Sequence, residues 1–423
     1  MTTQQTLQTE EYNQTELGEL PKEWDVEKIQ DFVDFERGAE PGSDNYNDKR
    51  KGIRFLRVSD ISGNRKEFIF TTSNKIKLCS PENILITFDG SPGIVKRGFT
   101  GAFSSGIRKV NLMSDSVDLE FIFYVLQTSF VQEVISKHST GVTIKHASKS
   151  IPHIKIPIPP LPEQQKIAYV LSTVQTAQER TQNFINSLKE LKKSAMKHLF
   201  TCGAVSFEDI DKVELKETEI GMMPKNWEIV ELGSISEIKS GGTPSTSKKE
   251  FWENGTIPWV KSGKCQDCYI NSVDSYITQA GLENSSTKML EPNTILVAMV
   301  GATVGKTGLL TFSACTNQNV AGIYPKNKTK LNYLYLYYML QSRYCDFTKT
   351  EGFVIANLSF IKKLPVPYPD FSEQQNIASI LSAIDEKIQA EEQKKEALKE
   401  TFNSLLKNLM TAKIRVNNLE VGA

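Results

Sequence analysis

Long apolar runs and net charge are both lacking in this 423-residue sequence. No stretch of about 18 apolar residues occurs, so no transmembrane helix is expected. Residues 1–13 are polar and lack the basic and apolar regions of a secretory signal, so we expect a disordered leader over residues 1–14 of a cytoplasmic protein. Basic and acidic residues number 50 each, which is unusual for a non-specific nucleic-acid binder but compatible with a binder whose charges are segregated.

Catalytic and metal-binding signatures are missing as well. The four histidines (138, 146, 153 and 198) have neither triad nor metal-ligand spacing, and no G-x-S-x-G or H-E-x-x-H motif occurs. The glycine-rich cofactor turn and the Asn/Asp-Pro-Pro-aromatic signature of a methyltransferase are both absent. Cys265 and Cys268 form a lone CxxC pair without the two further ligands that zinc requires. We therefore expect no catalytic residue and no metal site, and reduced thiols for the six scattered cysteines.

One segment resembles a phosphate-binding loop but does not meet its spacing. Gly301–Thr307 has three residues between its first two glycines, where such a loop needs four. We interpret it as the turn that follows a strand, with Gly90–Gly93 as its counterpart in the first half of the chain.

An internal repeat organises the chain. Residues 15–26, which contain Thr-Glu-Leu-Gly and end in Pro-Lys-Glu-Trp-Asp-Val, return 203 residues later as 218–229. A proline-rich block that leads into Glu-Gln-Gln occurs at 156–165 and again at 366–375. A period near 200 residues is too long for a solenoid and indicates a duplicated unit of one globular domain and one helix.

Between these blocks, both halves carry a similar series of predicted strands. β-branched and aromatic runs bounded by Gly, Pro, Asn and Asp occur at 53–57 and 83–88, and again at 257–261 and 294–299. The expected helical stretches are 119–134 and 331–344. We predict a mixed α/β (α+β) fold in each half, with a shared core and different surface loops.

Two long helices are predicted after the domains, at 163–200 and 373–410. Apolar residues in both recur at alternating steps of four and three, which is typical of a coiled-coil seam. At 1.5 Å per residue each helix would be about 57 Å long, too long for one small domain, so the helices are expected to pack on each other. The predicted seam residues are Ile167, Leu171, Val174, Ile185, Leu188, Leu199, Ile377, Leu381, Ile384, Ile388, Leu398, Phe402, Leu405 and Leu409.

Antiparallel pairing of these helices is favoured, because the linker can then run from the far end of the first helix into the second domain. This arrangement predicts two globular domains related by a pseudo-twofold axis and separated by two antiparallel coiled-coil helices. Parallel pairing would place the domains side by side, and two separate domain-capping helices are the remaining alternative. The predicted segments are a leader at 1–14, domains at 15–162 and 218–372, helices at 163–200 and 373–410, a linker at 201–217 and a tail at 411–423.

Positive charge concentrates in the surface loops, whereas acidic residues concentrate in the second long helix. Lys and Arg would neutralise DNA phosphates, while Arg, Asn, Gln, Ser and Thr read base edges; ordinary solvated charge is the alternative for any single residue. The predicted DNA-binding residues of the first half are Lys49, Arg50, Lys51, Arg54, Arg57, Ser59, Arg65, Lys66, Ser91, Lys96, Arg97, Thr143, Lys145, His146 and Lys149. Those of the second half are Lys239, Thr243, Ser245, Lys248, Lys249, Lys261, Ser262, Lys264, Thr303 and Lys306.

The repeated blocks resemble those of the specificity (S) subunit of type I restriction–modification enzymes. The resemblance lies in Thr-Glu-[Leu/Ile]-Gly-x-x-Pro-x-x-Trp at the opening of each half and in Ile-Pro-[Ile/Leu]-Pro-Pro-Leu-x-Glu-Gln before a long helix. Residues 156–165 follow the second pattern, and 366–375 depart from it slightly as Val-Pro-Tyr-Pro-Asp-Phe-Ser-Glu-Gln-Gln. Further similar segments are 241–245, 254–259 and 317–319, whereas the first half keeps only Gly38 and Pro41 of the Gly-Gly-Thr-Pro motif.

This resemblance implies a non-catalytic subunit with two target recognition domains, each reading one part of a split, asymmetric sequence in double-stranded DNA. The helices would act as a spacer and, with the repeated blocks, as the docking surface for two modification subunits. Those partners would bind S-adenosylmethionine and methylate adenine at N6, and restriction subunits would add cleavage that uses ATP and Mg. This chain itself would bind no cofactor.

Two other functions are compatible with parts of the sequence. One is a nucleotide-dependent or methylating enzyme, against which the short glycine loop argues. The other is a coiled-coil adaptor that joins two protein-binding domains, and sequence-selective retention of DNA would argue against it.

Overall fold

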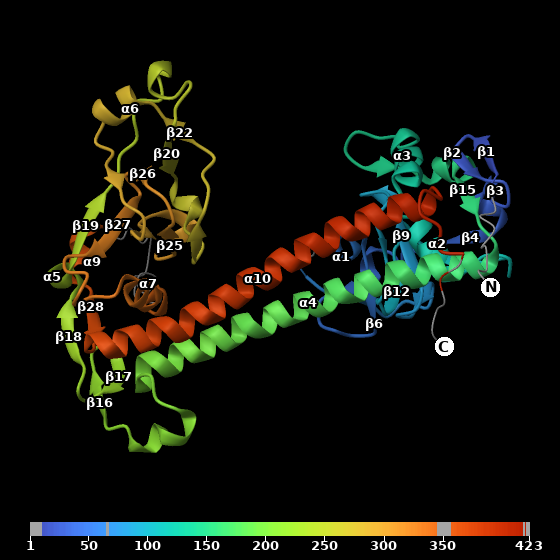
Figure 1. The fold of residues 1–423 in the computed structure, drawn as a ribbon. Coiled ribbons are helices and arrows are strands. Elements are labelled where there is room, and N and C mark those ends of the chain that lie inside the picture. The colour runs from blue at the N-terminus through green and yellow to red at the C-terminus, as the bar shows by residue number, and fades with distance from the viewer. Residues whose placement is uncertain (1–10, 65–66, 345–356, 418, 420–423) are drawn as a thin grey trace, which may run out of the picture. The chain divides into compact units, whose positions relative to one another are not determined.

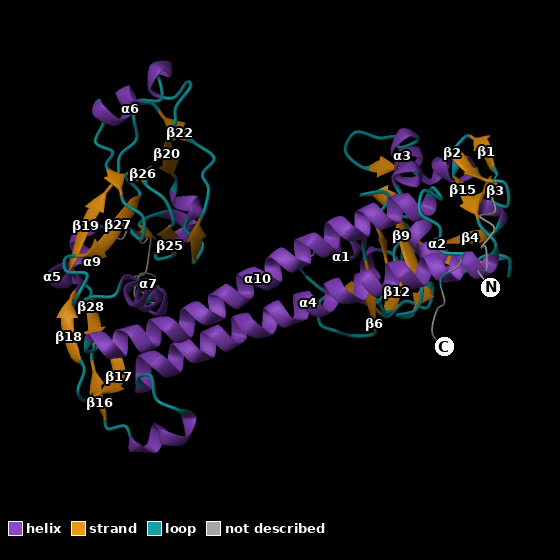
Figure 2. Cartoon of the chain, viewed as in Figure 1, coloured by secondary structure: helices purple, strands orange, loops and turns teal. Residues whose placement is uncertain are grey.

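The computed structural model describes residues 11–64, 67–344, 357–417 and 419. The chain divides into two compact units, Met1–Gln182 with Gln393–Ala423 (unit 1) and Asn183–Glu392 (unit 2). Both are mixtures of strands and helices, as predicted (Figures 1 and 2). Among the helices of these described residues, none is long and apolar enough to cross a membrane.

Each unit contains a hairpin built from the first repeated block. In unit 1 it joins β1 (Tyr12–Thr15) to β2 (Gly18–Pro21), and in unit 2 it joins β16 (Leu215–Thr218) to β17 (Gly221–Pro224). Gly18 and Gly221 both have φ = +108°, a conformation that side chains other than glycine rarely adopt. The repeated Thr-Glu-x-Gly sequence is therefore a turn signal.

These hairpins move two of the predicted boundaries. Tyr12–Thr15 pairs residue by residue with Gly18–Pro21, so ordered chain begins inside the expected leader 1–14. The expected linker 201–217 likewise contains a 3-10 helix, η4 (Phe207–Lys212), and most of β16. In both places polar sequence forms ordered structure because its backbone groups find hydrogen-bond partners in a neighbouring segment.

Two sheets form the frame of each unit, and their strand orders correspond. Unit 1 has a sheet of order β11-β9-β13-β4, formed by β4 (Val33–Arg37), β9 (Ile84–Thr87), β11 (Val95–Lys96) and β13 (Ile107–Leu112). Its other sheet has the order β5-β7-β6-β12-β8, formed by β5 (Tyr46–Asn47), β6 (Ile53–Leu56), β7 (Ile69–Thr71), β8 (Leu78–Cys79) and β12 (Gly101–Phe103). The predicted strands at 53–57 and 83–88 are thus confirmed as β6 and β9.

Unit 2 repeats this frame. One sheet has the order β19-β27-β24-β25-β21, formed by β19 (Ser236–Ser240), β21 (Cys268–Ile270), β24 (Ile295–Ala298), β25 (Thr307–Leu310) and β27 (Val320–Pro325). The other has the order β22-β20-β26-β23, formed by β20 (Ile257–Val260), β22 (Tyr276–Ile277), β23 (Met289–Leu290) and β26 (Ala314–Thr316). The strands β9 and β24 are buried at every position, which explains their unbroken apolar runs.

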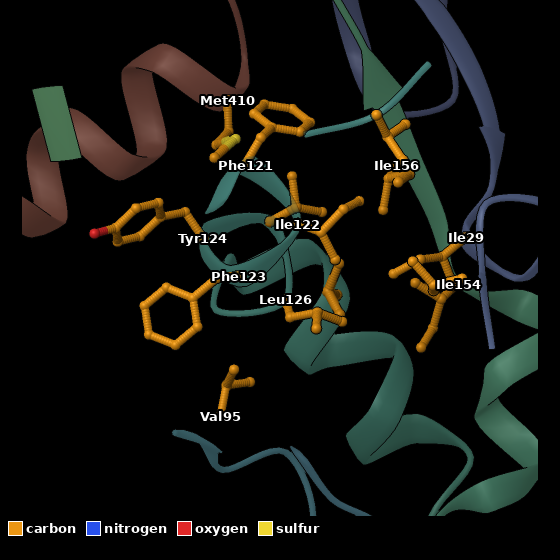
Figure 3. Packing of buried hydrophobic residues seen from close by; sticks show 14 of the residues in the cluster. Ile29, Val95, Phe121, Ile122, Phe123, Tyr124, Leu126, Ile154, Ile156 and Met410 are labelled. Atoms are coloured by element: carbon orange, nitrogen blue, oxygen red, sulfur yellow. The ribbon is translucent and has the colours of Figure 1, made fainter. Parts of the chain in front are cut away.

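A short buried helix closes the core of each unit. In unit 1 this is α2 (Leu119–Val125), which is followed by α3 (Ser129–Lys137); in unit 2 it is α7 (Tyr333–Ser342). Figure 3 shows Phe121, Ile122 and Leu126 of the α2 region packed among Ile154, Ile156 and Met410. Met410 belongs to the C-terminal helix, so residues nearly 300 positions apart in the sequence share one core.

The proline-rich block forms an edge strand in each unit. β15 (Lys155–Ile158) pairs with β3 (Asp25–Lys28), and β28 (Pro365–Tyr368) pairs with β18 (Glu228–Glu231). Proline is tolerated there because each of these sheets has only two strands, so one side of every strand needs no backbone donor. The pairing joins the second repeated block to the first.

A buried glutamine then ties the start of each long helix to the short core helix. Gln164 donates from Nε2 to the carbonyls of Pro159 (2.8 Å) and Ser116 (3.0 Å), and its Oε1 accepts from the backbone N–H of Asp118 (2.9 Å). Asp118 is the N-cap of α2. The side chain of Gln164 is fully buried, so this amide satisfies polar groups that water cannot reach.

Gln374 makes the same three contacts in unit 2. Its Nε2 donates to the carbonyls of Pro369 (2.9 Å) and Lys330 (3.1 Å), and its Oε1 accepts from the N–H of Asn332 (2.9 Å), the N-cap of α7. The Glu-Gln signature in the sequence is therefore a structural clamp, and we call Gln164 and Gln374 the clamp glutamines.

The two long helices are α4 (Leu161–Cys202) and α10 (Phe371–Met410), each beginning two residues before its predicted start. Within unit 1 they run antiparallel, since Gln178 donates to the carbonyl of Leu398 (3.0 Å) and Lys395 donates to Gln182 (2.5 Å). Within unit 2 they also run antiparallel, with Lys192 against Asp385. In each unit the α4 and α10 segments lie side by side (Figure 1), which confirms the antiparallel alternative.

All fourteen predicted seam residues are buried or half-buried. Toward the ends of the helices, several of them pack into the core of a unit: Ile167, Leu171 and Leu409 in unit 1, and Leu199, Ile377 and Leu381 in unit 2. Leu406 and Met410, which were not predicted as seam residues, are also buried in the core of unit 1. The stripe thus serves both helix pairing and attachment of the domains.

A polar network interrupts the seam in unit 2. Lys192 forms an ion pair with Asp385 (2.7 Å), and both side chains are about 85% buried. The hydroxyl of Tyr338 donates to Asp385 (2.8 Å) and lies 3.1 Å from the hydroxyl of Tyr269. The network joins α4, α10, α7 and β21, and it stabilises one helix register because any slip would separate the charges.

The corresponding positions in unit 1 are apolar or uncharged. Phe402 of α10 corresponds to Lys192 by the shift that relates Glu163 to Glu373, and Gln175 of α4 corresponds to Asp385. Tyr124 corresponds to Tyr338, and its ring packs 6.0 Å from that of Phe402. At this position unit 2 therefore has a buried ion pair, whereas unit 1 has two packed rings.

We expect Gln374→Ala to lower the free energy of unfolding by roughly 2–4 kcal/mol, because buried partners lose their hydrogen bonds. The neighbouring Gln375 is exposed, and Gln375→Ala is expected to change stability by less than about 0.5 kcal/mol. Urea unfolding followed by tryptophan fluorescence measures both. Equal effects of the two substitutions would contradict the clamp.

A second prediction concerns the Lys192–Asp385 pair. Asp385→Gln leaves a largely buried ammonium without its carboxylate and should cost roughly 2–3 kcal/mol. The double variant Lys192→Phe with Asp385→Gln copies the residues of unit 1 and should recover most of that loss. Additive losses in a double-mutant cycle would show that the pair does not act as a unit.

Candidate nucleic-acid interface

In unit 2, polar loops gather at one edge of the two sheets. The carboxyl ends of β19, β20, β24 and β26 and the amino ends of β25 and β27 all face this edge. We call it the polar edge of unit 2; its loops are 241–245, 261–264, 299–306 and 317–319.

Hydrogen bonds join these loops across the two sheets. The N–H of Gly242 donates to the carbonyl of Thr316 (2.9 Å), and the hydroxyl of Thr243 donates to the side chain of Gln318 (2.5 Å). Thr303 donates to the carbonyl of Ser262 (3.4 Å), and Lys306 donates from Nζ to Gln266 (2.9 Å). A Cβ on Gly241 would lie 2.0 Å from the carbonyl oxygen of Thr316, so only glycine allows this close approach.

Unit 1 has the equivalent edge, formed by the carboxyl ends of β4, β6, β9 and β12. The N–H of Gly38 donates to the carbonyl of Ile107 (3.1 Å), and the N–H of Ser104 donates to that of Leu56 (2.9 Å). A short hairpin over residues 139–146 is added to this edge, because β14 (Lys145–His146) pairs with β10 (Asp89–Gly90). We call this the polar edge of unit 1; its segments are 38–40, 57–62, 88–93, 104–106 and 139–149.

The segment that resembles a phosphate-binding loop belongs to the polar edge of unit 2. Gly301–Thr303 is a single 3-10 turn, η7, and the N–H of Gly305 returns to the carbonyl of Ala298 (2.8 Å). In unit 1 the N–H of Gly93 returns to the carbonyl of Thr87 at the same distance, 2.8 Å. The segment is thus a turn after a strand, as predicted.

The polar edges bring together more than half of the predicted DNA-binding residues. In unit 1 these are Arg57, Ser59, Ser91, Thr143, Lys145, His146 and Lys149, and in unit 2 they are Thr243, Ser245, Lys261, Ser262, Lys264, Thr303 and Lys306. All of them are exposed or half-buried. These residues are far apart in the sequence. The topology of the sheets brings them to one edge, because the strands that precede them share one direction.

The other predicted residues lie elsewhere. Lys49, Arg50 and Lys51 precede β6 and therefore lie at its amino end, away from Arg57. Lys96 and Arg97 lie at the end of β11 remote from Ser91. In unit 2, Lys239 lies within β19, while Lys248 and Lys249 lie in the connection between β19 and β20. Arg65 and Lys66 fall outside the described residues.

Several of the cations have intramolecular partners. Arg54 lies 3.3 Å from the buried carboxylate of Asp60 and 4.7 Å above the ring of Phe68. Arg97 pairs with Glu120 and lies over Phe123. In unit 2, Lys248 and Lys249 pair with Glu250 and Glu253, and Lys264 pairs with Asp274. Part of the positive charge of each unit therefore has a structural role.

Three further cations near unit 1's first sheet also have intramolecular partners. Lys109 and Lys77 donate to Glu36, and these hydrogen bonds lower the pKa of that carboxyl to about 2. Arg108 is 6% exposed and donates to Ser148 (2.9 Å), and burial lowers its pKa. The side chains of Lys77, Lys109 and Arg108 therefore support the frame beneath the edge.

The amide side chains at and beside the edge of unit 2 were not predicted as DNA-binding residues. The side chain of Gln318 accepts a hydrogen bond from the hydroxyl of Thr243, and that of Gln266 accepts one from Nζ of Lys306. The side chain of Asn317 accepts from the N–H of Asn319 (3.2 Å). Asn and Gln are the side chains that best recognise adenine. The run Asn317–Asn319 directly before the buried strand β27 was the available signal.

The CxxC pair lies next to the same edge. Cys265 is buried, which raises the pKa of its thiol to about 12, whereas Cys268 is exposed. Within the described parts of the chain, no three His, Cys, Asp or Glu side chains are placed to hold one metal ion.

Comparison with known proteins gives consistent similarities. A family model for the type I restriction modification DNA specificity domain matches residues 21–190 and again 224–400. The type I restriction enzyme MjaVIII specificity subunit of Methanocaldococcus jannaschii is 28% identical over 418 residues, which cover 95% of each protein. The type I restriction enzyme EcoR124I/EcoR124II specificity subunit of Escherichia coli is 28% identical over 293 residues, covering 67% of this chain and 68% of that protein.

A solved structure supports the fold. The crystal structure of the type I restriction–modification S subunit from M. genitalium matches with a TM-score of 0.59 at 19% identity, covering 91% of this chain and 96% of that one. At this identity the likeness concerns the fold alone.

Proposed function

The chain belongs to the type I restriction modification DNA specificity domain family, and from this premise we propose that each polar edge reads one half of a split DNA target. Within a type I restriction–modification system, such a chain is the DNA-recognition component and not the catalytic one.

The observation that carries this proposal is that one frame is built twice with different side chains at its polar edge. Unit 2 offers an amide at Gln318 and another beside the edge at Gln266, whereas unit 1 offers Arg57 and the added hairpin 139–146. Asn and Gln bind adenine in two-point contacts, and Arg does so with guanine. Two unlike edges on like frames support an asymmetric target with two different half-sites.

Exposed lysines at the edges supply the sequence-independent part of binding. Lys145 and Lys149 in unit 1 and Lys261 in unit 2 are exposed, and each charge that neutralises a phosphate releases a counterion. Binding is therefore expected to weaken steeply with salt although the whole chain is formally neutral.

We assign α4 and α10 two roles, as a spacer between the half-sites and as part of the surface that docks two modification subunits. Those partners would carry S-adenosylmethionine and methylate adenine at N6, while restriction subunits would supply cleavage with ATP and Mg. The chain itself supplies position and sequence selectivity in this scheme, so it needs no cofactor.

Mapping of N6-methyladenine across the genome tests the proposal directly. Cells that contain this gene should show a gapped, asymmetric methylated motif, and cells without the gene should lack it. Loss of the gene with no change in any methylated motif would overturn the proposal. Expression of the intact gene from a plasmid provides the control, because it should restore the motif.

A change in helix length should change the gap between the half-sites. Deleting 183–189 from α4 and the facing 388–394 from α10 removes about 10.5 Å of helix, which corresponds to about three base pairs of DNA. The methylated motif of this variant should have a shorter gap with unchanged half-sites. Alanine substitutions at exposed positions of the same segments are the control, and an unchanged gap in the deletion variant would exclude the spacer role.

A further inference from the structure

The hairpin added to the polar edge of unit 1 has an apolar tip. Every residue from Thr140 to His146 is exposed. Val142 has a relative exposure of 102%, the largest of any large hydrophobic side chain in the described residues, and Ile144 is 56% exposed. These solvated apolar side chains contribute nothing to the core and are accessible to a binding partner.

The hairpin is closed by two backbone hydrogen bonds. The N–H of Thr140 donates to the carbonyl of His146 (2.9 Å), and the N–H of His146 donates back to that of Thr140 (2.7 Å). Gly141 has φ = +99°, and a Cβ there would lie 2.1 Å from the carbonyl oxygen of Ile144. The turn therefore requires glycine at position 141.

The base of the hairpin is anchored to the sheet. His146 pairs with Asp89 both in the strand register and through its ring, whose Nδ1 lies 2.8 Å from the Asp89 carboxylate. The next residue, Ala147, is fully buried, and its N–H donates to the carbonyl of Phe88 (2.8 Å). Val142 and Ile144 are thus presented at a defined place on the polar edge.

The surroundings of the tip favour DNA as the partner. Lys145 and Lys149 are exposed and form no ion pair among the described residues, whereas the nearby acid Asp89 is paired with His146. A narrow convex hairpin fits a major groove about 12 Å wide, in which the C5-methyl group of thymine is the apolar feature of the base edges. A protein partner would instead be expected to meet a broader patch with aromatic anchors.

We propose that Val142 and Ile144 recognise thymine, through contact with C5-methyl groups in the half-site that unit 1 reads. This inference rests on the proposed function and adds a specificity determinant that carries no hydrogen-bonding group. The flanking Lys145 and Lys149 bind the adjacent phosphates and hold the tip in the groove.

The test uses the complex of the full chain with its modification subunits and duplexes that contain the mapped methylation target. Each thymine of both half-sites is replaced singly by deoxyuridine, which removes only the methyl group. Affinity is measured by fluorescence anisotropy at constant salt. We expect one or two replacements, all within one half-site, to weaken binding by the wild-type complex about three- to tenfold.

The double variant Val142→Ser with Ile144→Ser should bind the unmodified target less tightly and should no longer respond to those replacements. Met113→Ser is the matched control, since Met113 is also 56% exposed in unit 1 but lies beyond the end of β13 that is remote from the polar edge. It should respond to deoxyuridine like the wild type. Thermal unfolding of both variants should match the wild type, because all three side chains are solvated.

Two results would overturn the inference while leaving the proposed function intact: a wild-type complex that is insensitive to every replacement, or a double variant that responds like the wild type. Loss of co-purification with the modification subunits in the double variant alone would assign the tip to a protein contact instead. If the wild-type complex selects no duplex at all, the proposed function fails first, and this inference falls with it.

Discussion

The buried amide of a glutamine at the start of each long helix is the interaction on which the rest of each unit depends. Gln164 and Gln374 connect the long helix and the proline-rich strand just before it to the residue before the core helix, which is distant in sequence. Because an amide has both donors and an acceptor, a single side chain satisfies all three segments. No apolar or charged residue of similar size offers this combination, so the direction in which each long helix leaves its domain depends on glutamine.

The antiparallel pairing of α4 and α10 then makes the C-terminal helix a component of unit 1. Leu409 and Met410 are buried in the same core as Phe121 and Ile122, and Arg415 forms an ion pair with the buried Glu163 (2.7 Å). Unit 1 is therefore completed only by the last part of the chain. This arrangement explains why the chain cannot be divided into two independent halves at the boundary of the sequence repeat.

The two units share one frame of strands but differ in the side chains attached to it. The two units share the order of four strands in each sheet, the parallel pairs β6–β12 and β20–β26, and the turn at the polar edge, whereas β5 and β21 are additional strands of one unit each. The side chains at the edge differ, and so does the polar network of Lys192 and Asp385, which is replaced by Phe402 and Gln175 in unit 1. Backbone hydrogen bonds between strands hold the frame, and these bonds do not depend on which side chains the strands and loops carry.

Four features could be predicted from the sequence: the duplication, the mixed α/β class, the central strands at 83–88 and 294–299, and the stripe that pairs the long helices. Each of these follows from a local pattern of apolar residues or from a repeated motif. The sequence did not determine the hairpin that begins at Tyr12, the clamp made by Gln164 or the partner of Arg54, since hydrogen bonds and ion pairs between distant residues leave no periodic trace. Only the tertiary structure decided which cations share one edge: Arg57 and Lys145 lie together, whereas Lys51 and Lys96 lie elsewhere. The direction of each strand sets the end at which its loop emerges, and that direction is fixed by pairing with other strands of the folded sheet.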